Sequence, residues 1–267
     1  MENLQKIALL IDADNTQLSK MEAVLREISI YGRIVVKRAY GNWRKDSLKS
    51  WESELKRLAI RAEQQFDYTT GKNATDIALT IDAINLLHRD IYDAFVIVSS
   101  DSDFTPLAIS IHESGVYVIG VGEKKTPIAF RNSCDNFIYL ENLDKPDEPP
   151  PQPAAAQKSA GAGKGQAKPA EKTQEADSIQ EIHDLLKMAF DTYQEDDGYV
   201  TVGFVGQFIK RAKPDFDVRT YGFKTLTQLV EAFPERYVMK RYSGKGTTMI
   251  TAYQCKTKKK QPERGKR

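Results

Sequence analysis

Strand-like runs and amphipathic stretches alternate along the first 143 residues. Strands are predicted at residues 6–11, 33–38, 64–68, 94–98, 116–121 and 137–140. Helices are predicted where apolar positions recur every three or four residues, at residues 21–30, 45–61 and 75–87. Most of the strand-like runs are continuously apolar, so we expect helices on both faces of the sheet. The pattern predicts an α/β domain with a doubly wound, mainly parallel, Rossmann-like sheet.

The pattern changes over residues 144–177, where Pro, Ala, Gly, Lys and Gln dominate. Such a segment buries too little apolar surface to offset its ordering entropy, so we expect a disordered linker. Three further helices and a hairpin are predicted at residues 178–191, 202–212, 217–233, and 237–241 with 249–255. This order is typical of a small winged-helix α+β domain over residues 178–255.

Composition narrows the class of protein. The 267 residues are 40% hydrophobic, which is enough for two cores. No apolar run reaches the roughly 18–20 residues of a membrane helix, and the N-terminal apolar run is too short for a signal peptide. Cys134 and Cys255 stand in no metal-ligand spacing, which favours a reducing compartment. We therefore expect a cytoplasmic protein without membrane contact.

Charge is concentrated at the C-terminal end. The net charge is only +2, but residues 256–267 hold seven Lys or Arg and one Glu. We expect this tail to be disordered. It would attract polyanions without sequence choice, or it would only keep the end of the chain soluble.

Acidic and amide side chains follow two of the predicted strands. Residues 6–11 lead into Asp12, Asp14 and Asn15, and residues 94–98 are followed by Asp101 and Asp103. In a parallel sheet, ligands bind outside the carboxyl ends of the strands, so Asp12 and Asp101 are expected to converge. Hard oxygen ligands without His or Cys suit Mg²⁺ or Mn²⁺.

Asp76 adds a third carboxylate at the start of the helix predicted over residues 75–87. A divalent ion held by such acids activates water and stabilises phosphoryl charge, which is the chemistry of phosphodiester hydrolysis. No glycine-rich phosphate loop follows a strand, which disfavours dinucleotide and NTP binding. Asp82 lies about 240° around the same helix from Asp76, so we expect a structural role for it.

Each acid also has a structural alternative. Asp14, Asn15 and Asp103 are each placed to cap a following helix. Asp76 is placed to complement the dipole of its own helix.

Cations and aromatic residues cluster around the end of the second predicted strand: Lys37, Arg38, Tyr40, Trp43 and Arg44. The cations would hold phosphates and the rings would stack on a base, or the rings would simply pack the loop. Lys72, in a glycine-containing turn before Asp76, would neutralise a phosphate or balance the acids.

The segments LLIDADN, VVKRAYGNW, FDYTTGKNATDIALTIDAI and FVIVSSDSDF resemble the NYN domain of the LabA-related group, over nearly all of residues 5–142. The resemblance implies a PIN-like fold and a metal-dependent endoribonuclease. It places the metal-site acids at Asp12, Asp76 and Asp101. We predict Asp103 as a further metal ligand, and Asn15 and Asp14 as supporting residues.

The segment FDVRTYGFKTLTQLVE resembles the LOTUS (OST-HTH) domain, which is winged-helix-like and associated with RNA binding. The resemblance makes single-stranded or structured RNA the expected partner. Candidate contacts are Lys210, Arg211, Lys213, Arg219, Tyr221, Lys224 and Lys245. Acidic and basic residues balance in this domain, so a protein partner is the alternative.

Three functions compete on these observations. The leading hypothesis is a ribonuclease dependent on Mg²⁺ or Mn²⁺, whose second domain recruits RNA. The main alternative is a non-catalytic RNA-binding or regulatory adaptor that keeps the acidic pocket as a scaffold. A small-molecule phosphatase is disfavoured, because Asp14 is followed by Asn15 and Thr16 rather than by a phosphatase nucleophile motif.

Overall fold

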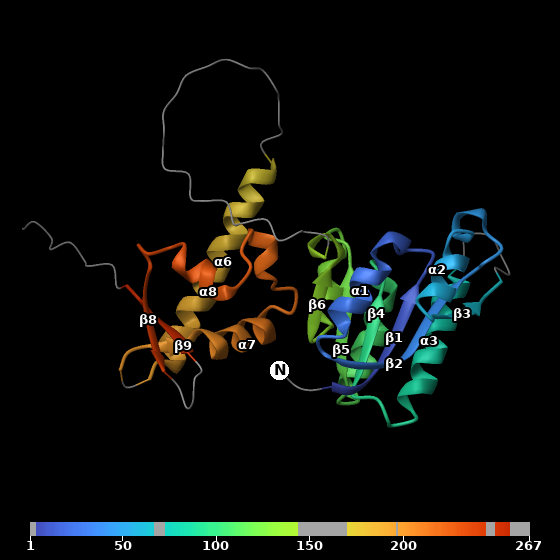
Figure 1. Ribbon diagram of the computed structural model, residues 1–267, viewed down its shortest axis with the longest axis horizontal. Coiled ribbons are helices and arrows are strands. Elements are labelled where there is room, and N and C mark those ends of the chain that lie inside the picture. Colours follow the sequence, from blue (N-terminus) through green and yellow to red (C-terminus); the bar gives the residue numbers. More distant parts are fainter. Residues whose placement is uncertain (1–3, 67–72, 144–169, 196, 244–248, 257–267) are drawn as a thin grey trace, which may run out of the picture. The chain divides into compact units, whose positions relative to one another are not determined.

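The computed structural model describes residues 4–66, 73–143, 170–195, 197–243 and 249–256 (Figure 1). These residues form two compact units, each described below by itself. The first contains β1 to β6 and the second contains α6 to β9. Within these ranges, no helix is both long enough and apolar enough to cross a membrane.

The first unit is built on a six-stranded sheet in the order β3-β2-β1-β4-β5-β6, with every pair parallel. The strands are β1 (Leu4–Asp12), β2 (Gly32–Gly41), β3 (Arg61–Gln64), β4 (Ala94–Val98), β5 (Tyr117–Gly122) and β6 (Asn136–Tyr139). From β1 the chain adds β2 and β3 on one side of β1, and it then crosses to add β4, β5 and β6 on the other side of β1. The point where the order reverses therefore lies between β1 and β4, and a crevice for ligands is expected at their carboxyl ends.

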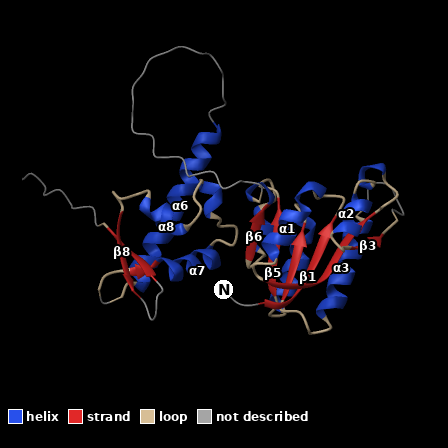
Figure 2. Cartoon of the chain, in the orientation of Figure 1, coloured by secondary structure: helices blue, strands red, loops and turns tan. Residues whose placement is uncertain are grey.

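Helices cover both faces of this sheet, as predicted (Figure 2). One face packs against α1 (Met21–Ile28) and α2 (Trp51–Arg57). The other packs against α3 (Ala74–Leu87), α4 (Thr105–Glu113) and α5 (Ile128–Asn132). Side chains of β1 alternate between the two cores, because successive residues of a strand point to opposite faces. This confirms the doubly wound fold.

Two predicted elements of the first unit have different bounds. The helix predicted over residues 45–61 is a short 3-10 turn, η2 (Asp46–Leu48), followed by α2. Ala59 has a positive φ of 50°, which ends the helical path before Arg61 enters β3. The strand predicted over residues 64–68 thus begins earlier, and residues 67 and 68 lie outside the described residues.

The second unit combines helices with a three-stranded antiparallel sheet in the order β7-β9-β8. Its elements are α6 (Ala170–Tyr193), β7 (Val200–Thr201), α7 (Val202–Ala212), the 3-10 helix η5 (Val218–Tyr221), α8 (Leu226–Glu231), β8 (Tyr237–Ser243) and β9 (Met249–Cys255). The predicted hairpin is β8 with β9. The short β7 was not predicted, because two residues carry no detectable period.

The helix predicted over residues 217–233 is wrong, because it is two separate elements. Gly222 adopts a left-handed φ of 81° and ends η5. Thr225 then starts α8, its side chain accepting a hydrogen bond from the backbone N–H of Gln228. The predicted linker is also shorter, because α6 begins at Ala170, in a stretch rich in the good helix formers Ala, Glu, Lys and Gln.

Candidate active site

Asp12 is the last residue of β1 and is fully buried at the point where the strand order reverses. The backbone N–H of Asn15 donates to Asp12 Oδ1 at 3.3 Å, and the Asn15 side chain donates to Oδ2 at 2.9 Å. The Ser99 hydroxyl, directly after β4, donates to the same Oδ2 at 2.8 Å. Burial raises the pKa of Asp12, and the hydrogen bonds from Asn15 and Ser99 counter part of the rise.

Asp101 and Asp103 lie in the loop that follows β4. The N–H of Asp101 donates to Ser99 Oγ at 3.1 Å, which links this loop to Asp12. Asp101 Oδ1 accepts from the N–H of Asp103 at 2.9 Å and so caps the 3-10 helix η3 (Ser102–Phe104). Asn73, at the start of α3, donates to Asp103 Oδ2 at 2.8 Å. The loop is therefore held against both β1 and α3.

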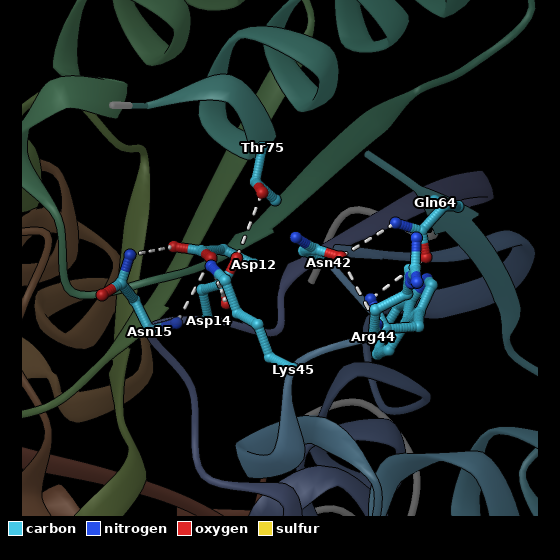
Figure 3. Close-up of polar contacts among 9 residues, drawn as sticks. Asp12, Asp14, Asn15, Asn42, Arg44, Lys45, Gln64 and Thr75 are labelled. Atoms are coloured by element: carbon cyan, nitrogen blue, oxygen red, sulfur yellow. Dashed lines mark hydrogen bonds and ion pairs between the residues drawn. The ribbon is translucent and has the colours of Figure 1, made fainter. Parts of the chain in front are cut away.

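Asp14 joins two further segments to the site. Its Oδ2 accepts from the Thr75 hydroxyl of α3 at 3.1 Å, and its Oδ1 lies 3.1 Å from Lys45 Nζ in the loop after β2. Figure 3 shows both side chains directed at Asp14, with Asn15 directed at Asp12. The helix-cap role given as the alternative for Asp14 is not realised, because its oxygens accept these contacts from α3 and from the loop after β2.

Asp76, in the first turn of α3, shows that the acids share one site. Burial raises the pKa of Asp76 to about 6, and four carboxylates add to the rise: Asp12, Asp101, Asp103 and Asp14. Carboxylates raise each other's pKa in this way only when they lie close together. The hydrogen bonds that join Asp12, the loop of Asp101 and α3 likewise place the acids in one region of the sheet edge.

The donor set fits a hard divalent cation in chemistry and in charge. Carboxylate oxygens are the ligands that Mg²⁺ and Mn²⁺ prefer. Burial is the main cause of the raised pKa of Asp76, and the neighbouring negative charge adds to it, which a cation would relieve. Among the described residues, however, no three acidic, histidine or cysteine side chains are already placed around one metal position. The acids form one electrostatic site and not a closed cage.

Replacing Asp76 by Asn is expected to stabilise the metal-free protein at about pH 7.5, by roughly 1–2 kcal/mol after allowance for solvent screening. The folded pKa of about 6 lies above the ordinary 3.8, so the ionised carboxylate opposes folding above pH 6. Below pH 3.8 the group is protonated in both states and the difference vanishes. Urea unfolding in EDTA at about pH 7.5 and below pH 3.8 measures the difference in free energy of unfolding between the variant and the original protein. An equal stabilisation at the two pH values would contradict the explanation.

Arg38 and Tyr40 were predicted to contact substrate, and the structure corrects both. The Arg38 guanidinium binds Asp82 at 2.7 and 2.5 Å, and the Tyr40 hydroxyl donates to the same carboxylate. Tyr40 is only 2% exposed, so its ring cannot stack on a base. The structural role predicted for Asp82 is confirmed. Lys37 is likewise engaged, since its Nζ donates to the carbonyl of Leu58 at 2.7 Å.

Trp43, in the loop after β2, packs the loop, which is the alternative to stacking on a base. The centroid of the Trp43 ring lies 6.1 Å from that of Trp51, and Trp43 Nε1 donates to the carbonyl of Glu63 at 3.1 Å. Arg44 has an exposed side chain and stays a candidate contact. Lys72 lies outside the described residues.

The candidate RNA contacts of the second unit lie in segments that follow one another along the chain. Lys210 and Arg211 are in the last turn of α7, Arg219 and Tyr221 are in η5, and Lys224 follows η5 in the sequence. Arg219 pairs with Asp217 at 2.8 Å, so part of its charge is already balanced. Lys245 lies outside the described residues, as does the tail beyond Lys256.

The sequence prediction missed four residues that organise the site. Ser99 holds Asp12, Thr75 and Lys45 hold Asp14, and Asn73 holds Asp103. Each lies within two residues of a predicted site residue or motif. Their partners depend on which loops meet at the sheet edge, which local spacing does not contain.

Comparisons with known proteins identify two domain families. A family model of the NYN domain matches residues 6–141, and one of the OST-HTH/LOTUS domain matches residues 177–248. No curated protein matches the chain. Among solved structures, the chain is similar to a protein of unknown function from Vibrio parahaemolyticus, with 19% identity and a TM-score of 0.45 over 54% of this chain and 97% of that one.

Both resemblances drawn from the sequence are confirmed by these family models. NYN domains are part of the PIN-like nuclease superfamily, and OST-HTH/LOTUS domains bind RNA, so the pair supports a nuclease-type role associated with RNA. The NYN family model covers slightly more than half of the residues of this chain, so the chain belongs to the NYN domain family.

Proposed function

We propose that the protein is a ribonuclease that depends on Mg²⁺ or Mn²⁺ and cleaves phosphodiester bonds at the acid cluster. The observation that carries the proposal is the gathering of carboxylates at the carboxyl ends of β1 and β4, where Ser99 joins Asp12 to the loop of Asp101 and Asn73 joins that loop to α3 beside Asp76. A buried core gains nothing from such a gathering of like charges. A site that binds a cation does, because the cation turns mutual repulsion into attraction.

The chain's own residues have distinct roles in this proposal. Asp76, Asp101, Asp103 and Asp12 would hold the cation, and Asn15 with Ser99 fixes the orientation of the Asp12 carboxylate. The bound ion would lower the pKa of a water molecule and stabilise charge on the phosphoryl oxygens. Lys45, which is paired with Asp14, limits the negative charge at the rim of the site.

The metal requirement gives a direct test. Full-length protein is expected to cleave labelled single-stranded RNA with Mn²⁺, to lose cleavage in EDTA, and to regain it when Mn²⁺ is added in excess. The reason is that the carboxylates alone offer no positive charge to the phosphoryl oxygens. Gel analysis of the products measures the effect. Cleavage that persists in EDTA would reject the metal site.

A second candidate is a non-catalytic RNA-binding adaptor. It is favoured by the lack, among the described residues, of three side chains already arranged around one metal position. The same assay separates the two functions. RNA binding without cleavage of any substrate, in the presence of Mn²⁺, would select the adaptor.

The second unit is proposed to recruit RNA through cations near the end of α7. Changing Lys210 and Arg211 together to Ala is expected to weaken RNA binding and to reduce the slope of log K against log salt by about 1.4, because two phosphate contacts are lost. Fluorescence anisotropy at several salt concentrations measures this. Lys187→Ala, on the exposed surface of α6, is the control. Weaker binding with an unchanged slope would mean that the two side chains make apolar contacts and not phosphate contacts.

A further inference from the structure

A groove of about 620 Å³ lies between α3 and the start of α4 and is continuous with the acid cluster. It falls in the range of about 300–1,000 Å³ that is typical of ligand sites. Along α3 its lining changes from Asn73 and Asp76 in the first turn to Thr80 and Ile81 farther along the helix. One end of the groove therefore belongs to the acid site, and the rest is largely apolar.

Two isoleucines on α3 leave an unusual amount of apolar surface exposed in this groove. Ile77 is 59% exposed and Ile81 57%, while Leu79 and Ala83 on the opposite face are fully buried in the core. Residues four apart lie on the same side of a helix, so the two side chains form one stripe. Single exposed isoleucines are common, but an apolar stripe in a groove beside a polar site marks a contact surface.

The chemistry of the lining indicates which part of a nucleic acid this stripe would meet. No Lys or Arg is among the described residues that line the groove, so its walls offer no charge to phosphates. Isoleucine and proline side chains match the faces of nucleobases. In a duplex those faces are covered by neighbouring base pairs, whereas unpaired bases expose them.

We propose that this groove, here called the base groove, binds the unpaired nucleobases that adjoin the phosphate held at the acid cluster. The substrate class is therefore single-stranded RNA. This inference rests on the proposed function, since the acid cluster must hold the phosphate for the groove to hold the neighbouring base.

The test replaces both isoleucines in the full-length protein, as Ile77→Ser with Ile81→Ser. The KM for cleavage of unstructured RNA is expected to rise about 10-fold, because the apolar contact between the isoleucines and the base faces is lost, while kcat changes little. Ile30→Ser is the matched control, since Ile30 is also 59% exposed and lies after α1, away from the groove. An unchanged KM in the double variant would overturn the proposal.

A binding measurement separates failure of the groove from failure of the nuclease assignment. Full-length protein is titrated with single-stranded RNA carrying 2-aminopurine, in Mn²⁺, and with the same RNA annealed to its complement. We expect the 2-aminopurine fluorescence of the single strand to rise on binding, because a base held against the isoleucines no longer stacks on its neighbours. We also expect weaker binding by the double variant and little binding of the duplex. If no RNA is cleaved but this pattern holds, the groove stands and the nuclease proposal falls. Equal binding of duplex and single strand, no binding of either, or a dimer that the double variant converts to monomer would overturn the groove.

Discussion

Replacing Asp101 by Asn is expected to slow RNA cleavage by about 100- to 1,000-fold while the fold stays intact. The substitution removes a negative charge from the site that would hold the cation. It keeps the structural contact, because an Asn side-chain oxygen still accepts the N–H of Asp103 that caps η3. Initial rates in Mn²⁺ on single-stranded RNA measure the loss, and thermal unfolding checks the fold.

Asp101 is a better choice for this test than Asp12. Asp12 is fully buried and accepts from donors on Asn15 and Ser99, so an amide nitrogen there would face other donors and destabilise the fold. Asp46→Asn is the matched control, because the Asp46 side chain is 89% exposed and its ion pair with Lys49 is on the surface. A cleavage rate of Asp101→Asn equal to that of the control would remove Asp101 from the mechanism.

Replacing Asp82 by Ala is expected to destabilise the first unit by about 2–4 kcal/mol, the largest stability effect that the polar contacts predict. The change leaves the Arg38 guanidinium and the Tyr40 hydroxyl without their shared acceptor. The side chains of Arg38 and Asp82 are only 15% and 25% exposed, so water replaces the lost contact poorly. The midpoint of urea unfolding measures the effect.

Two further variants sharpen this prediction. Glu52→Ala breaks an exposed ion pair with Lys56 on α2 and is expected to cost less than about 0.5 kcal/mol. Arg38→Met combined with Asp82→Leu is expected to recover most of the lost stability, because no charge is left unpaired. If Arg38→Met weakens RNA binding without affecting stability, Arg38 is a substrate contact after all.

The core of the first unit and the place of its acids could be predicted because both depend on local pattern. β1 and β4 are buried on both faces, and such strands are continuously apolar in the sequence. Asp12 ends β1 and Asp101 lies in the loop after β4, and parallel strands bring their carboxyl ends to one edge. The helical period of α3 also predicted correctly that Asp82 and Asp76 point in different directions, Asp82 toward Arg38 and Tyr40 and Asp76 toward the other acids.

The error at Tyr40 has a simple cause. The second strand was predicted to end at residue 38, which placed Tyr40 in a loop, but β2 continues to Gly41. Within the strand, Tyr40 alternates onto the face covered by α3, where Asp82 meets it. Strand length depends on pairing with β1 and β3, which the sequence of β2 does not contain. The partners of Ser99 and Thr75 depend on tertiary pairing in the same way.

The all-parallel sheet separates the molecule's chemistry from its most tolerant surface. β1 and β4 lead to the acid cluster at the carboxyl edge, so the turns at the amino edge lie at the other end of the sheet. One of these turns, between α4 and β5, contains Gly115. A side chain added at Gly115 would meet no atom within 4 Å of its Cβ. A fluorophore, an affinity tag or an inserted reporter at this turn would label the protein without touching the acid cluster.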